Sequence, residues 1–594
     1  MLSFFAQFVF QKSYFQEIFL VKKHSNFLGG FVFIVLLFSN VSAQDNAISK
    51  IKPPAPADAK SSAKSSKIVT GEDIEQDVAE ALTLIEDKHV SGKNLDYNGL
   101  FKSSIDNMLH ALDPHSNYFD AKETEEFRTS QNSQYFGIGA TIGDLSDANG
   151  KVIATFIKAT FEGAPANRAG LRYGDKIIDV NNVSMLGKSN AEVRTFLRGP
   201  RGTPAKIMVE RYSTGKRETV EIIRDAVSLP SISEYYLIRP GVGYIALTGG
   251  FNHTTFNEFQ TAMRQLKSQG MTQLVLDLRD NPGGLVNQAT KIANTFLERG
   301  QSIFTQKGRV EGIWKTTQAD NTAPDETPIV LLVNNYSASA SEILAGALQD
   351  HDRALVVGEN SYGKGLVQNP FMLDYGSMLL LTIAKYETPS GRLIQRDYSD
   401  GSLYNYHSKG GSLGEETESQ RPKGAASKTD SGRIVYSGGG INPDTVVKPQ
   451  TITIEKARSQ QKLIDPIFAF ALDLAYGKIA GFDNYKIDRP ISFEYDIKAT
   501  DFPATENIYQ AFKTFAVAKY KFTPAQIDRE REFVGRALRT EFVTAAYGST
   551  TSFQVRNEFD NQLKKAIELL PEAKQLAIEG AKAKAKKEKA EINR

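Results

Sequence analysis

The chain has 594 residues, of which 41% are hydrophobic and 24% charged, which excludes an intrinsically disordered tail protein and allows several folded domains. Lysine plus arginine total 71 and aspartate plus glutamate total 69, and this near balance argues against a dedicated nucleic-acid-binding protein. The absence of cysteine excludes disulfides, thiolate metal sites and cysteine nucleophiles, and the 7 histidines lack metal-binding spacing, so we expect no metal and no cofactor.

The N-terminus has the layout of a secretory signal peptide. Lys22 and Lys23 precede an apolar run over residues 27–38, and the small-x-small motif Val41-Ser42-Ala43 follows the run. The run is shorter than the roughly 20 residues of a membrane span, but an uncleaved anchor, and with it an association with the membrane, stays open. We therefore predict that residues 1–43 are a signal peptide cleaved after Ala43, and that the protein is exported to the periplasm or cell envelope.

The next two segments differ in composition. Residues 44–70 are rich in proline, alanine, serine and lysine, which is typical of a linker. In residues 71–134, the apolar positions Ile74, Val78 and Leu82 recur at helical spacing, so we expect an N-terminal helical region.

Three larger regions follow. Residues 135–225 alternate short β-type runs with glycine-rich turns and two short helical segments, which predicts a compact β-rich domain. Residues 226–454 alternate strands with helices, the pattern of an α/β layered core, and we expect their polar insertion at 397–437 to be a mobile loop. Residues 455–594 carry helical patterns and a basic tail, so the fold class is α/β multidomain with a C-terminal helical region.

The strongest chemical signal lies between residues 333 and 368. A predicted strand at 329–333 runs through a turn into a helix that begins near Ser339. A serine at such a junction is exposed, and N–H groups at the helix start can face a developing oxyanion. The alternative is that Ser339-x-x-Glu342 is a capping box that only starts the helix.

Lys364 is a candidate general base because it lies between two glycines that allow a close approach of the backbone. A lysine acts as a base only when neutral, so burial must lower its pKa from about 10.4. Gln368 lies four residues later and can orient the amine by a hydrogen bond. The alternative is a lysine in a surface loop.

The segment Asp277–Gly284 reads DLRDNPGG and follows a predicted buried strand. Its Asn-Pro-Gly-Gly end makes a tight turn whose N–H groups can supply a second oxyanion donor, unless it is a plain turn.

Taken together, these motifs resemble the carboxy-terminal processing peptidases, also called tail-specific proteases. The similarity covers roughly residues 75–450 and follows the family's order. Besides DLRDNPGG and SASASEI…GALQD…GKG…VQ, the matching segments are Leu112–Tyr118, Phe136–Gly139, Ala164–Ile178, Leu197–Gly202, Thr388–Arg392 and Gly440–Asp444.

The resemblance implies a crotonase/ClpP-like α/β protease core with an inserted PDZ domain over residues 135–225. The family uses a Ser–Lys dyad with the serine 25 positions before the lysine, which selects Ser339 over Ser337 and Ser341. The other implied positions are Gln368 as dyad support, the backbone N–H of Ala340 and of Gly283 or Gly284 as the oxyanion hole, Asp350 and Arg198 as supporting residues, and Gly137, Ile138 and Gly139 as the PDZ carboxylate loop. His351 is not expected to take part.

The expected function is an exported serine endopeptidase that recognises the C-terminal end of protein or peptide substrates through its PDZ domain. A homo-oligomer and an adaptor protein stay open as partners. The alternatives are a catalytically silent PDZ adaptor of the envelope and a crotonase-like hydratase, although a hydratase has no use for a buried lysine next to a serine.

Overall fold

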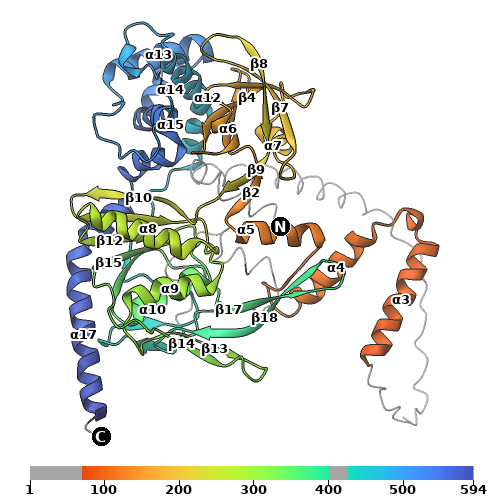
Figure 1. The fold of residues 1–594 in the computed structure, drawn as a ribbon, viewed down its shortest axis with the longest axis vertical. Coiled ribbons are helices and arrows are strands. Elements are labelled where there is room, and N and C mark those ends of the chain that lie inside the picture. The colour runs from red at the N-terminus through yellow and green to blue at the C-terminus, as the bar shows by residue number, and fades with distance from the viewer. Residues whose placement is uncertain (1–69, 400–405, 407–423, 488, 593–594) are drawn as a thin grey trace, which may run out of the picture. The chain divides into compact units, whose positions relative to one another are not determined.

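The computed structural model describes residues 70–399, 406, 424–487 and 489–592 (Figure 1). The predicted signal peptide and almost all of the predicted linker lie outside these residues, as do positions 400–405 and 407–423 of the predicted insertion. Across the described ranges, no helix combines the length and apolar character that crossing a membrane requires.

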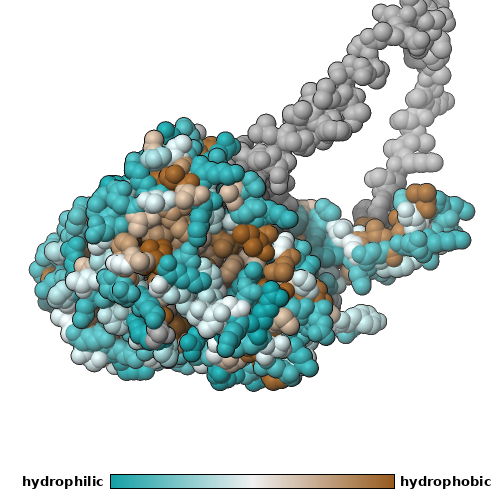
Figure 2. Space-filling view, turned by 90° about the horizontal axis from the view of Figure 1, so that it is seen from above, coloured by the Kyte–Doolittle hydropathy of each residue, from teal (hydrophilic) through white to brown (hydrophobic). Residues whose placement is uncertain are grey.

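The described chain falls into two compact units, residues 70–109 and residues 110–592. The small unit holds α3 (Gly71–Lys88), η1 (Gly92–Asn94) and most of α4 (Tyr97–His110). The Thr70 side chain accepts from the Asp73 N–H and caps α3, which buries none of its residues. Its apolar positions, among them Ile74 and Val78, are exposed, and hydrophobic side chains are visible on this unit in Figure 2.

The large unit is built around a mostly parallel sheet of six strands. Their order is β10-β11-β12-β15-β16-β21, and only the β10–β11 pair is antiparallel. The strands are β10 (Ile232–Arg239), β11 (Val242–Leu247), β12 (Gln273–Asp277), β15 (Ile329–Val333), β16 (Ala354–Gly358) and β21 (Thr445–Val446).

Both faces of this sheet are covered, as its continuous apolar strands require. Leu331 packs with residues of α8 (Thr255–Ser268), α9 (Val286–Phe296) and α10 (Ala340–Asp350) on one face. Leu332, its neighbour, packs with residues of α16 (Asn561–Glu568) and α17 (Leu570–Ile592) on the other. The C-terminal helices therefore complete the core of a domain that begins more than 300 residues earlier in the chain, and α17 can be followed along the sheet in Figure 1.

A second sheet has the order β1-β18-β13-β14, with β17 also paired to β18. Its strands are β1 (Asn117–Phe119), β13 (Ser302–Gly308), β14 (Lys315–Gln318), β17 (Leu366–Met372) and β18 (Met378–Glu387). Helix α5 (Ala121–Gln131) follows β1 and leads into the β-rich domain.

The chain enters the β-rich domain through strand β2 (Gln134–Gly137) and leaves it through strand β9 (Asp225–Ser228), and these two strands pair with each other. Its sheet has the order β3-β4-β5-β7-β8, with β6 beside β5, and two short helices. The elements are β3 (Ala140–Ser146), β4 (Val152–Thr160), α6 (Pro165–Arg168), β5 (Lys176–Val180), β6 (Val183–Ser184), α7 (Asn190–Leu197), β7 (Pro204–Glu210) and β8 (Arg217–Ile223). The α/β multidomain fold expected from the sequence is thus confirmed.

The predicted C-terminal helical region has two parts. A separate apolar core joins α12 (Ile454–Ala475), α13 (Glu506–Tyr520), α14 (Pro524–Arg529) and α15 (Arg531–Asn557), with η2 (Asp483–Tyr485) beside it. Helices α16 and α17 instead belong to the α/β core, because their apolar residues pack on its parallel sheet.

The predicted insertion at 397–437 is not a loop throughout. Its end forms a hairpin of β19 (Ala426–Lys428) and β20 (Ile434–Tyr436). The turn of the hairpin is held by Asp352, whose carboxylate accepts from the Ser431 N–H at 2.5 Å and from the Arg433 guanidinium at 2.7 Å. These two hydrogen bonds to a buried carboxylate hold the turn of the hairpin in place.

The β-rich domain docks on α12 and α15 through a largely buried ion pair. The Lys158 amine lies 2.6 and 2.8 Å from the two carboxylate oxygens of Glu541, and Tyr173 donates to the same carboxylate at 3.1 Å. Around this pair, Phe156 packs edge-on against Phe468, and burial lowers the pKa of Lys158 against the opposing pull of Glu541.

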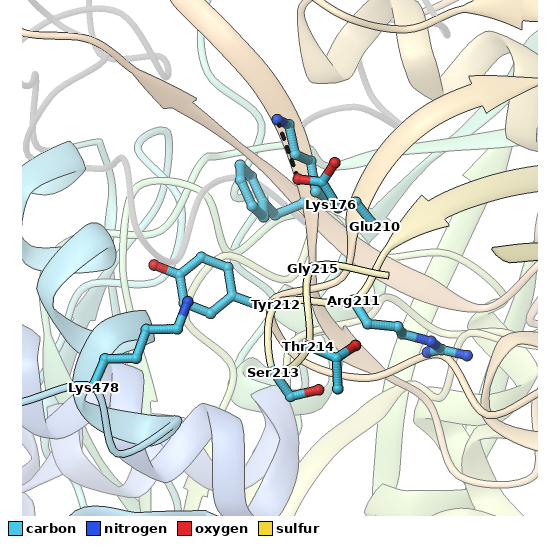
Figure 3. Close-up of a pocket in the computed structure, with 9 residues that line it drawn as sticks. Lys176, Glu210, Arg211, Tyr212, Ser213, Thr214, Gly215 and Lys478 are labelled. Carbon is cyan, nitrogen blue, oxygen red and sulfur yellow. Dashed lines mark ion pairs between the residues drawn. The ribbon is translucent and has the colours of Figure 1, made fainter. Parts of the chain in front are cut away.

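A pocket of about 410 Å³ lies at the rim of the same contact (Figure 3). It is formed by the turn between β7 and β8 and by Lys478, whose amine lies 3.6 Å from the centre of the Tyr212 ring. No predicted site residue lines it, so we assign it no catalytic role.

We predict that Glu541→Ala undocks the β-rich domain, because it leaves the buried Lys158 without its partner. Breaking a buried pair in this way costs about 3–5 kcal/mol. The matched control is Glu568→Ala, which removes an exposed pair with Lys565 and should cost at most about 1 kcal/mol. Urea unfolding followed by circular dichroism measures both, and equal effects of the two substitutions would contradict this assignment.

Candidate active site

Three serines lie in the turn from β15 to α10, and their environments differ. The Ser337 hydroxyl is buried and donates to the Leu278 carbonyl at 2.8 Å, and the Ser341 hydroxyl is buried and donates to the Asn281 carbonyl at 3.0 Å. Ser339 is partly exposed between two buried alanines. The structure therefore leaves Ser339 as the serine of the three that can meet a substrate.

Ser339 has a strained backbone, with φ 56° and ψ −114°. A residue with a side chain adopts such angles only where its surroundings impose them, and such strain clusters at functional sites. Here the chain must bend sharply, because strand β15 ends at Val333 and helix α10 begins at Ala340.

The buried carboxylate of Glu342 joins this turn to the lysine loop. It accepts from the Ser339 N–H at 2.8 Å, the Gly363 N–H at 2.6 Å, the Lys364 N–H at 2.9 Å and the Ser361 hydroxyl. Burial raises the pKa of the Glu342 carboxyl, and the hydrogen bonds from these donors oppose the rise. Because the N–H groups of Ser339 and Lys364 share one oxygen, the two predicted catalytic residues lie next to each other.

Tyr386 of β18 makes a second connection. Its hydroxyl lies 3.1 Å from the Ser339 carbonyl oxygen and 3.0 Å from the Lys364 carbonyl oxygen, and it donates to one of them at a time. The ring is almost fully buried, so this bridge is fixed in place.

The amine of Lys364 donates to Oε1 of Gln368 at 2.6 Å, as the sequence analysis expected of that pair. Burial lowers the pKa of Lys364 to about 8, although Asp113 and Glu342 favour its charged form. Among the described residues, no hydrogen bond joins the Lys364 amine to the Ser339 hydroxyl. Burial thus makes the neutral amine easier to reach, and Gln368 holds the amine in the arrangement seen here.

The two candidate glycines of the oxyanion hole are not equivalent. The Gly283 N–H already donates to Oδ1 of Asn281 at 2.9 Å, whereas in the described chain the N–H groups of Gly284 and Ala340 have no partner. Gly283 instead provides the close approach, because a Cβ there would lie 2.8 Å from the Ser339 Cβ and 3.0 Å from the Ala340 nitrogen. This geometry favours Gly284 over Gly283 as the second donor, since Asn281 occupies the Gly283 N–H.

Asp350 lies away from the predicted dyad. It ends α10, about 15 Å along the helix axis from its start, and pairs with Arg392 at 2.7 Å with both side chains fully buried. Asp350 therefore supports the Thr388–Arg392 segment. His351 contacts Asp430 and the Ser302 carbonyl, at 2.7 and 2.8 Å, and does not reach the site either.

The predicted carboxylate loop, Gly137 to Gly139, connects β2 to β3. It is fixed by its carbonyls, because that of Ile138 accepts from the Ala166 N–H at 2.7 Å and that of Gly139 from the Phe161 N–H at 3.0 Å. Ile138 is buried and packs in the core of the domain. The role predicted for Gly137, Ile138 and Gly139 in binding a terminal carboxylate stays a prediction.

Arg198 lies beside the carboxylate loop. It is exposed, and its guanidinium carbon lies 4.9 Å from the centre of the Tyr135 ring. Burial raises the pKa of that tyrosine to about 12, and Arg198 opposes the rise. The contact places a cation beside the loop, and the role predicted for Arg198 stays a prediction.

Neither Glu342 nor Tyr386 was predicted from the sequence to be a residue of the site. Glu342 was visible only as the last residue of a capping box, although the apolar run that follows it, residues 343–348, was a signal that this carboxylate is buried. Tyr386 had no such signal, because its role depends on the packing of β18 beside two loops. The described residues contain no cluster of His, Asp or Glu able to hold a metal ion.

Comparison with known proteins matches residues 241–400 to peptidase family S41 and residues 156–211 to the PDZ domain family. A carboxy-terminal-processing protease of Bartonella bacilliformis is 35% identical over 300 residues, which are 50% of this chain and 67% of that protein. A probable CtpA-like serine protease of Staphylococcus aureus is 36% identical over 305 residues, 51% of this chain but less than two thirds, 59%, of that protein.

Among solved structures, the photosystem II D1 C-terminal processing protease is 26% identical, with a TM-score of 0.32, over 64% of this chain and 94% of that chain.

We predict that Glu342→Gln separates the serine turn from the lysine loop. Glutamine offers one acceptor oxygen and turns an NH₂ group toward donors, so at least one buried donor is left unpaired at a cost of about 1–3 kcal/mol. Peptide hydrolysis should fall at least about tenfold. The control Glu387→Gln loses only a partly exposed pair with Lys307, and an equal loss in both variants would refute the bridging role.

Proposed function

The chain belongs to the carboxy-terminal-processing proteases of peptidase family S41, which are serine-type peptidases, and from this membership we propose that it is an exported endopeptidase. In this proposal it binds the C-terminal end of its protein substrates through the PDZ domain and cleaves them with a Ser339–Lys364 dyad. The observation that carries the proposal is the shared Glu342 oxygen, which brings the backbone of the exposed serine next to that of a lysine whose pKa is lowered to about 8.

In the first step, neutral Lys364 takes the proton of the Ser339 hydroxyl, and the serine oxygen attacks the scissile carbonyl. This step requires the lysine amine to turn from Gln368 toward Ser339, and the Glu342 carboxylate that holds the two backbones together supports such a movement. Gln368 then acts as the resting partner of the amine, and it keeps a nearly buried donor satisfied between turnovers.

The tetrahedral oxyanion lies between the N–H groups of Ala340 and Gly284. Each such donor contributes about 3 kcal/mol to the transition state. The amine of the C-terminal product takes the proton from Lys364 and leaves, and an acyl-enzyme remains on Ser339. Water activated by the same lysine then releases the second product.

Substrate recognition is assigned to the PDZ domain. The N–H groups of the Gly137–Gly139 turn face a terminal carboxylate, and β3 pairs with an extended peptide, because β3 is an edge strand whose one neighbour in the sheet is β4. Arg198 adds a positive charge beside the turn. Export rests on the basic, apolar and small-residue order of residues 22–43 in the sequence alone.

We predict that Ser339→Ala abolishes hydrolysis of an unfolded protein while the affinity for a C-terminal peptide is unchanged. The matched controls are Ser337→Ala and Ser341→Ala, which remove buried hydroxyls and cost stability before activity. Loss of activity in a control with retention in Ser339→Ala would reassign the nucleophile. Peptide binding without hydrolysis in the wild type would instead indicate a PDZ adaptor.

We predict that activity rises with pH through an ionisation near 8. Below the lowered pKa of Lys364 the amine is protonated and cannot accept a proton, and above it the amine is neutral. Lys364→Arg keeps the positive charge but cannot deprotonate in this range, so it should lose activity as fully as Lys364→Ala. The pH dependence of kcat/KM measures both effects, and an active Lys364→Arg enzyme would refute the dyad.

A further inference from the structure

The motif Asp113-Pro114-His115-Ser116 has no role in the function proposed above, yet the fold brings it to the lysine. It directly precedes β1, which pairs with β18 in the register Asn117 to Leu380. Strand β18 also pairs with β17, in which Gln368 lies opposite Thr382. The segment 113–116 is therefore held over the part of the sheet that carries Gln368.

The Asp113 carboxylate is buried and fully engaged. Its Oδ1 accepts from the N–H groups of His115 and Ser116, both at 2.9 Å, and from the Thr382 hydroxyl at 3.0 Å. Its Oδ2 accepts from the Ser116 hydroxyl at 2.6 Å, and the Ser116 oxygen in turn accepts from the Thr382 N–H at 3.0 Å. Four donors therefore hold the Asp113 carboxylate in this place.

The same segment determines which way the Gln368 amide faces. The His115 carbonyl accepts from Nε2 of Gln368, and this leaves Oε1 to accept from the Lys364 amine at 2.6 Å. A flipped amide would set an oxygen against the His115 carbonyl and an NH₂ group against the ammonium, so both contacts would be lost together.

The His115 ring extends the link to the lysine loop. It contacts the Tyr406 hydroxyl at 2.7 Å, Gln395 donates to that hydroxyl at 3.1 Å, and the Gly365 N–H donates to Oε1 of Gln395 at 2.8 Å. The segment is therefore connected to Lys364 and its loop by two routes, one through Gln368 and one through Tyr406 and Gln395.

We propose that the segment Asp113–Ser116 is a positioning element of the active site, which holds the Gln368 amide oxygen toward Lys364 and places a second carboxylate near its amine. The inference rests on the proposed function, because it gives Lys364 the role of the base. The charged groups that face this amine are Asp113 from the segment and Glu342 from α10, and both favour its protonated form against the effect of burial.

The test is the ionisation of Lys364 itself, followed by NMR of the full chain labelled with ¹³C at lysine Cε and assigned with Lys364→Arg. Asp113→Asn keeps the shape and most of the hydrogen bonds but removes the charge, so the pKa of Lys364 should fall by about 1 pH unit. The control Asp120→Asn makes the same change at the N-cap of α5, where asparagine caps equally well, and should leave the titration unchanged.

An unchanged titration in Asp113→Asn, or the same fall in Asp120→Asn, would overturn the proposal. Because the NMR measurement needs no substrate, its outcome is separate from that of the proposed function. A wild type that hydrolyses no peptide would refute the protease assignment, and the change in the pKa of Lys364 would still test the role of the segment Asp113–Ser116.

A second pair of variants tests the anchoring of Asp113 without touching its charge. Thr382→Val removes one of the four donors, and we expect kcat to fall severalfold with KM and the melting temperature nearly unchanged. Thr382→Ser retains the hydroxyl and should keep the wild-type rate. Equal rates in both variants would show that the anchoring of Asp113 does not act on the lysine.

Discussion

A single buried carboxylate, that of Glu342, holds the turn that carries Ser339 next to the loop that carries Lys364. An ionised carboxylate only accepts hydrogen bonds, and buried in the first turn of α10 it needs donors to offset the loss of water. The donors come from its own helix start and from the loop that carries Lys364. The requirement to satisfy one acidic group thus brings together two loops that are separate in the sequence.

The parallel sheet supplies the other part of the arrangement. Strands β12 and β15 are neighbours and run in the same direction, so the turns that follow them meet at one edge of the sheet. The turn after β12 carries Gly283 and Gly284, and the turn after β15 carries Ser339. Arg279 then anchors this edge to the C-terminal helices, because it pairs with Asp277 at 2.6 Å and with Asp560 at 2.7 Å.

The β-rich domain is held by a different interface, formed with α12 and α15 around the Lys158–Glu541 pair. One chain therefore contains a PDZ domain and a peptidase core, joined through the short pair β2–β9 and through a helical region that contacts the PDZ domain. The contact includes Leu145 of β3 as well as Phe156 of β4, and β3 has no strand partner on its second edge among the described residues.

The sequence alone determined the elements of the core, because a buried parallel strand such as Ile329–Val333 is a continuous apolar run and an amphipathic helix such as Thr255–Ser268 repeats every three to four residues. It also indicated the family, through motifs in a fixed order, and the resemblance to that family implied Ser339, Lys364 and Gln368 as site residues. Only the tertiary structure distinguished Gly284 from Gly283, buried Ile138, and placed α16 and α17 on the sheet of the core. The reason is physical: local patterns report the periodicity of one segment, whereas the partner of an N–H group, the depth of a side chain and the neighbours of a helix depend on residues far away in the chain.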